Sequence, residues 1–69
     1  MPLTLAVPGE EYIIKRIGGN AELRAHLQDL GLVSGAVVTV VSSMGGNLII
    51  NVKNARIAIS REMAQKIYI

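Results

Sequence analysis

The sequence predicts a mainly β fold: a small closed or nearly closed barrel of five to six short strands, with one helix over about residues 21–30 and a short helical turn over about 61–66. Three observations favour this class. The segments of alternating apolar residues are short, glycines stand at the corners between them, and the strand–helix–strand spacing of a parallel sheet is absent. At 69 residues the chain is expected to form a single domain over residues 1–69.

The N-terminal segment contains two apolar stretches separated by a turn. Apolar residues alternate over residues 3–7, and Pro8-Gly9 is typical of a turn. Residues 11–17 are expected to form one strand. Gly18-Gly19 then ends that strand and leads into the helix.

The helix has a start signal and a stop signal. Asn20 is a good N-cap residue, and an apolar stripe at helical spacing follows it. Gly31 stands where a residue with positive φ would end the helix, so Leu32 could fold back onto Leu27 in a Schellman motif. The stripe consists of Leu23, Leu27 and Leu30.

The C-terminal half is rich in β-branched residues, which favours antiparallel sheet. Lys53-Asn54 is typical of a two-residue hairpin turn, in which Asn54 is expected to take positive φ. Ser60 is expected to cap the short helical turn. The expected strands cover residues 36–42, 48–52, 55–59 and 67–69, with a turn over 44–47.

Composition excludes several classes of partner. The formal net charge is only +2 and the seven basic residues are scattered, which argues against a nucleic-acid partner. With two Tyr, no Phe and no Trp, the chain lacks the rings for base stacking or for an aromatic groove that grips proline-rich peptides. No signal peptide and no apolar run of membrane-spanning length is found, so we expect a cytoplasmic protein that does not insert into a membrane.

The sequence carries no catalytic set, so we expect no enzyme and no cofactor. There is no Cys, and the single histidine lies in the predicted helix. Gly18-Gly19-Asn20 is not followed by the Lys-Ser/Thr of a phosphate-binding loop, and helix initiation is its expected role. Glu22, His26 and Asp29 share one flank of the helix, either as weak Fe²⁺ ligands or as a solvated polar flank. We predict no metal site, because such sites draw their ligands from several elements.

Three motifs follow one another along nearly the whole chain: Pro8-Gly9 with Ile14 and Ile17; Leu27-x-x-Leu30-Gly31-Leu32-x-x-Gly35-x-x-Val38-x-Val40; and Arg56-Ile57-Ala58-Ile59 with Ala64-x-x-Ile67-x-Ile69. In this order and spacing they resemble the ferrous iron transport protein A (FeoA) family. The departures are Asn54 where the family usually has Gly, Gly46-Asn47 where it often has Asp-Pro, and Ser60 where it often has Arg or Lys.

The resemblance implies an SH3-like barrel that serves as an accessory of ferrous iron uptake. Its implied partner is the cytosolic part of a membrane iron transporter with a G-protein domain (FeoB). The alternative is a regulatory domain that acts with a metal-dependent repressor. Because the chain begins at Met1 and shows no DNA-binding helices, we expect the free-standing accessory.

The high apolar fraction, 51%, predicts that some apolar residues stay exposed and contact a partner, with weak self-association as another possibility. We expect this surface on the outer side of the helix and at its exit. For the valines, simple coverage of the second sheet face is an equal alternative. The predicted partner-binding residues are Arg24, His26, Gln28, Val33, Val37 and Val41.

Overall fold

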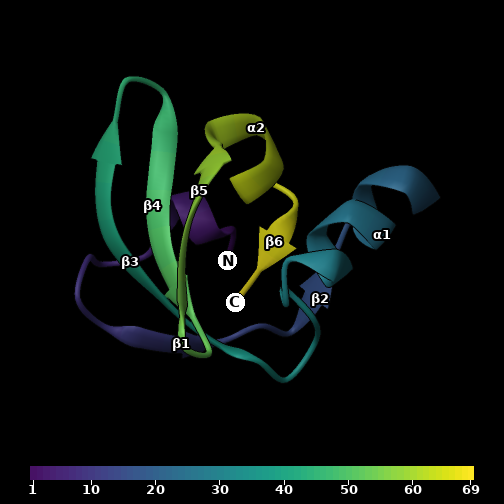
Figure 1. Cartoon of the computed structure of the whole chain (residues 1–69), viewed down its shortest axis with the longest axis horizontal. Coiled ribbons are helices and arrows are strands. Elements are labelled where there is room, and N and C mark those ends of the chain that lie inside the picture. The colour runs from purple at the N-terminus through teal and green to yellow at the C-terminus, as the bar shows by residue number, and fades with distance from the viewer.

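The computed structural model describes residues 1–69 and confirms a mainly β fold with six strands (Figure 1). A four-stranded antiparallel sheet has the order β1-β3-β4-β5, and a two-stranded sheet pairs β2 with β6. The elements are η1 (Leu3–Leu5), β1 (Glu11–Ile13), β2 (Arg16–Ile17), α1 (Ala21–Asp29), β3 (Val37–Met44), β4 (Asn47–Val52), β5 (Ala55–Ser60), α2 (Arg61–Ala64) and β6 (Ile67–Tyr68).

The first apolar stretch is a single turn of 3-10 helix, although its residues alternate as in a strand. Leu3 is fully buried, whereas Leu5 is 65% exposed. The Ala6 N–H donates to Leu3 O (3.0 Å) and closes the turn. Leu3 thus fills the core without adding a strand to either sheet.

The strand expected over residues 11–17 is divided in two, because the chain changes sheets at Ile14 and Lys15. The Ile14 N–H donates to Ala36 O (2.9 Å), just before β3, and the next N–H, of Lys15, donates to Tyr68 O (2.7 Å) in β6. Ile14 is buried at this crossing. One continuous segment therefore joins the two sheets and closes the barrel.

The helix begins and ends as predicted. Asn20 Oδ1 accepts from the Leu23 N–H (2.8 Å), so Asn20 is the N-cap. At the other end, the Leu32 N–H donates to Leu27 O (2.9 Å) and the Gly31 N–H donates to Gln28 O (2.9 Å). These two bonds are the Schellman pattern, and Gly31 has a φ of +91°.

The β4–β5 hairpin differs from the prediction in the residue that takes positive φ. Lys53, with φ 55°, is the only non-glycine residue in that region of backbone space, and Asn54 is not. The two-residue turn itself is confirmed by the Val52–Ala55 pair. Ser60 Oγ accepts from the Met63 N–H (3.2 Å) and caps α2 as expected.

The core lies between the two sheets and is closed by α1, α2 and η1. It contains no buried polar or charged residue, so its stability rests on apolar packing alone. Leu23 and Leu30 pack against it from the predicted stripe. The buried residues are Leu3, Ile14, Leu27, Leu32, Val38, Val40, Leu48, Ile50, Val52, Ile59, Ala64, Ile67 and Ile69.

Gly31→Val is expected to lower the free energy of unfolding by about 1–3 kcal/mol. A Cβ at Gly31 would meet no atom within 4 Å, so the cost comes from the positive φ and not from a clash. Thermal unfolding measures it, with Gly31→Asn as the control, because Asn tolerates positive φ better than Val. Equal melting temperatures for wild type and Gly31→Val would contradict the role of this glycine.

Leu27→Ala is expected to lower the free energy of unfolding by about 2–5 kcal/mol, because it leaves a cavity in the core. Leu5→Ala is the control, since Leu5 is largely exposed and should cost far less. Denaturant titration of both variants gives the comparison. Similar losses for the two leucines would be inconsistent with Leu27 being a core residue.

Candidate partner-binding surface

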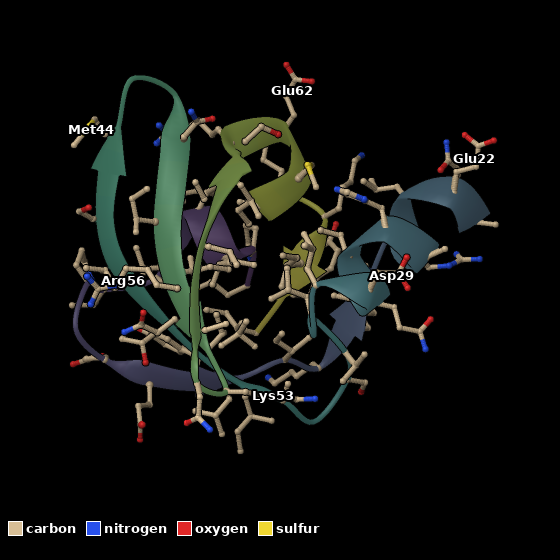
Figure 2. The ribbon with its side chains drawn as sticks, in the orientation of Figure 1. Glu22, Asp29, Met44, Lys53, Arg56 and Glu62 are labelled. Carbon is tan, nitrogen blue, oxygen red and sulfur yellow. The ribbon has the colours of Figure 1, made fainter.

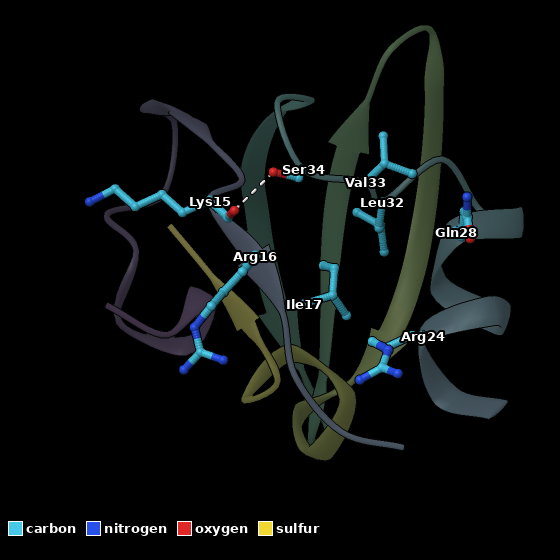
Figure 3. Close-up of a pocket in the computed structure, with 8 residues that line it drawn as sticks. All are labelled: Lys15, Arg16, Ile17, Arg24, Gln28, Leu32, Val33 and Ser34. Atoms are coloured by element: carbon cyan, nitrogen blue, oxygen red, sulfur yellow. Dashed lines mark hydrogen bonds between the residues drawn. The ribbon is translucent and has the colours of Figure 1, made fainter. Parts of the chain in front are cut away.

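A cavity of about 350 Å³ opens on the surface beside α1 and β2 (Figure 3). Three segments distant in sequence form it: the strand β2, one face of α1, and the loop that follows α1. Its lining residues are Lys15, Arg16, Ile17, Arg24, Gln28, Leu32, Val33 and Ser34.

The cavity's shape follows from how α1 begins and ends. Arg24 and Gln28 are four residues apart and therefore share one face of the helix. The Schellman stop turns the chain so that Val33 and Ser34 reach the same opening. Ser34 Oγ donates to Lys15 O (2.9 Å), which fastens the loop after α1 to the segment that leads into β2.

The cavity is cationic and partly apolar. Lys15, Arg16 and Arg24 line it, and no carboxylate residue does. Arg24 Nη1 donates to Gly19 O (3.1 Å), so its guanidinium lies near the C-terminal end of β2. The Arg16 guanidinium carbon lies 4.1 Å from the centroid of the Tyr68 ring, a cation–π contact.

The structure brings together three of the predicted partner-binding residues: Arg24, Gln28 and Val33 all line the cavity. His26 is exposed on α1 but does not line it, because a residue two positions from Arg24 faces another side of the helix. The strand residues Arg16 and Ile17 were missed. Their place depends on pairing with β6, about 50 residues later in the chain, which no local pattern indicates.

The predicted valines Val37 and Val41 lie on another surface, the outward face of the four-stranded sheet. Val37 is 46% and Val41 37% exposed, and they alternate with the buried Val38 and Val40. Val37 pairs with Ile13 of β1, which is 61% exposed. Thr39, which pairs with Glu11, lies between the two valines on this face, so the sheet exposes an apolar pair at Val37 and Ile13 and a separate valine at Val41.

The flank Glu22, His26 and Asp29 is exposed along α1. Figure 2 shows Glu22 near the start of α1 and Asp29 near its end, and both side chains are exposed. No group of three or more His, Cys, Asp or Glu residues is arranged to hold a metal ion. No helix is long and apolar enough to cross a membrane.

The chain forms a small antiparallel barrel with an apolar core, and its polar and charged residues are all on the surface. Comparison with known proteins identifies its family: the FeoA domain family matches residues 1–69. The chain is 35% identical over 68 residues to a candidate Fe(2+) transport protein A from Methanocaldococcus jannaschii, covering 99% of this chain and 83% of that protein. This chain belongs to the FeoA domain family.

Solved structures agree with this assignment. The crystal structure of an iron uptake regulatory protein (FeoA) has a TM-score of 0.89 at 32% identity, with 97% of this chain and 91% of that chain covered. At 22% identity and a TM-score of 0.83, zinc-complexed FeoA from Stenotrophomonas maltophilia, described as an SH3 domain protein, covers 97% of this chain and 86% of its own. A manganese-dependent transcriptional repressor shares the fold at 16% identity and a TM-score of 0.88, with 97% of this chain but 39% of that chain covered. The expected SH3-like barrel is thereby confirmed.

Titration with Mn²⁺, as a stand-in for Fe²⁺, is expected to cause no saturable amide shifts at low micromolar metal. Glu22, His26 and Asp29 come from one helix, and tight sites converge ligands from several elements. The measurement is two-dimensional NMR of labelled protein, with a His26→Ala variant as control. Saturable changes in the wild type that His26→Ala abolishes would establish a metal site.

Proposed function

We propose that this chain is a cytosolic accessory of ferrous iron uptake that binds the cytosolic part of an FeoB-like membrane transporter with a G-protein domain. Membership of the FeoA family supports a role in ferrous iron uptake. The observation that carries a binding role is the open cavity at the helix exit, where side chains from three segments converge on a barrel with an entirely apolar core.

The proposed contribution of this chain is binding and not catalysis. Cavity residues are amide, hydroxyl, cationic and aliphatic, which suits recognition of a partner segment. None of them is a carboxylate, histidine or thiol that could act as a general base near neutral pH. Transient regulatory contacts of this kind are often small, with dissociation constants on the order of micromolar.

The alternative is a regulatory domain acting with a metal-dependent repressor. The likeness of fold to the manganese-dependent repressor favours it, although an identity this low speaks only for the fold. The two hypotheses differ in the partner that the chain binds. The accessory binds the transporter's cytosolic region, whereas the regulatory domain binds the DNA-binding part of a repressor.

The two candidate binding surfaces, the cavity and the outward face of the four-stranded sheet, lie on different sides of the molecule. The cavity lies beside α1 and β2, whereas Val41 belongs to β3, across the barrel from α1 (Figure 1). One small interface does not cover both. We place the interface at the cavity, because its aliphatic lining residues, Ile17, Leu32 and Val33, are flanked by polar and charged groups, as interface centres commonly are.

Val33→Glu is expected to weaken binding to the transporter's cytosolic domain by on the order of tenfold or more, because it places a charge within the aliphatic lining of the cavity. Val41→Glu adds the same charge on the sheet and is expected to bind as the wild type does. Calorimetry with and without guanine nucleotide measures the affinity, and NMR confirms that both variants fold.

Reversed results, with Val41→Glu weakened and Val33→Glu unaffected, would move the interface to the outward sheet face. A wild-type chain that binds a repressor's DNA-binding part and not the transporter domain would replace the proposed function with its alternative.

A further inference from the structure

We propose that the cavity beside α1 and β2 receives an acidic peptide segment of the partner, in which a carboxylate side chain stands next to an aliphatic one. This inference rests on the proposed function for the identity of the partner, but the chemistry of the segment follows from the cavity itself. The relevant features are its charge, its apolar surface and its position on α1.

The charge of the cavity calls for an anion. Three of its eight lining residues are cationic and none is acidic, although the whole chain has seven basic and five acidic residues. Arg24 directs its guanidinium toward β2, beneath Ile17, whereas Lys15 and Arg16 extend outward on the far side of that strand (Figure 3). Arg24 is therefore the group placed to pair with a carboxylate inside the cavity. The charges of Lys15 and Arg16, the latter over the Tyr68 ring, lie across the strand and add only longer-range attraction.

Arg24 has donors to spare for such a pair. A guanidinium has five N–H donors, and the Arg24 side chain makes only one hydrogen bond within the chain, from Nη1 to Gly19 O. That bond holds the side chain near β2 and so reduces the entropy lost on pairing. The Gln28 amide, one turn further along the same face, is a second donor for a carboxylate or for a peptide carbonyl.

The remaining lining is aliphatic and suits a peptide better than a free anion. Ile17 and Val33 are half-buried and offer apolar surface to the cavity, whereas Leu32, which also borders it, is fully buried and anchors this part of the lining in the core. An aliphatic side chain next to the carboxylate would bury its surface there. The hollow over the β4–β5 hairpin lacks this feature, since Ala55 is its only apolar lining residue.

The position of the cavity on α1 argues against phosphate. Phosphates are favoured at helix N-termini, where free N–H groups and the positive end of the helix dipole point at them. Residues 20–23, whose N–H groups begin α1, do not line the cavity. Arg24 enters it by its side chain alone, and Gln28, Leu32 and Val33 lie toward the C-terminal end, where carbonyl groups make the dipole negative. A singly charged carboxylate that pairs with Arg24 tolerates this location better than a dianion does.

The first test uses a defined probe peptide, acetyl-Gly-Leu-Glu-Leu-Gly-amide, and its Gln-for-Glu analogue. Titration of labelled protein with the Glu peptide is expected to shift the amides of Ile17, Gln28 and Ser34 saturably, at millimolar peptide. The Gln peptide is expected to bind about threefold or more weakly, because it lacks the charge that pairs with Arg24. Added salt should reduce this difference.

The second test uses two variants that each remove one positive charge. Arg24→Gln is expected to weaken the Glu peptide about threefold or more, and to abolish the preference over the Gln peptide. Arg61→Gln is the matched control, since Arg61 is exposed at the start of α2 and does not line the cavity. It should leave both affinities within experimental error. Unchanged thermal unfolding of both variants shows that the fold is intact.

Several outcomes would overturn the inference. They are equal binding of the two peptides, equal effects of Arg24→Gln and Arg61→Gln, or shifts at the cavity with inorganic phosphate or phosphatidylglycerol vesicles that exceed those with the Glu peptide. Failure of the proposed function gives a different result. In that case the Glu peptide binds in an Arg24-dependent way, while the transporter's cytosolic domain neither binds nor competes with it.

Discussion

The hydrogen bonds around Ile14 and Lys15 are the constraint on which the rest of this structure depends. Ile14 is bonded to two adjacent residues just before β3, through its N–H to Ala36 O and through its O to the Gly35 N–H. One residue later, Lys15 is bonded to β6. The same short segment therefore closes the barrel and fixes the exit of α1. The Ser34–Lys15 bond adds to this link, so the cavity is formed by the very contacts that hold the two sheets together.

The parts of the fold that the sequence predicts correctly are those set by local chemistry. Asn20 and Ser60 cap helices through their own side chains, and Gly31 ends α1 through its own φ. Each of these signals needs only neighbours within a few residues, so the sequence displays them directly. The alternation of buried and exposed residues along β3 and β4 is local in the same sense.

The parts that the sequence does not predict depend on distant partners. Nothing in residues 11–17 indicates that the strand must divide, because the division comes from pairing with β3 on one side and β6 on the other. Leu3 looks like a strand residue but packs in a 3-10 turn. In the hairpin, positive φ falls on Lys53, the first residue of the two-residue turn, although Asn54 has the greater intrinsic tolerance for it. For the candidate site, helical spacing predicts that Arg24 and Gln28 share a face, and the glycine stop places Val33 at the helix exit. Arg16 and Ile17 could not be predicted, since β2 exists only through its pairing with β6.

The separation of core from surface means that surface side chains of this barrel can change without loss of the fold. All 13 buried residues are apolar, so no charged or polar group on the surface is needed to satisfy a buried one. Side chains such as Arg24 and Gln28 project from a helix whose other face, at Leu27, is anchored in the core. Changes in their charge are therefore expected to cost little stability. The same fold in a manganese-dependent repressor and in an FeoA protein is consistent with this arrangement. The apolar core maintains the barrel, which leaves the residues around the helix exit free to serve the binding role that we propose for them.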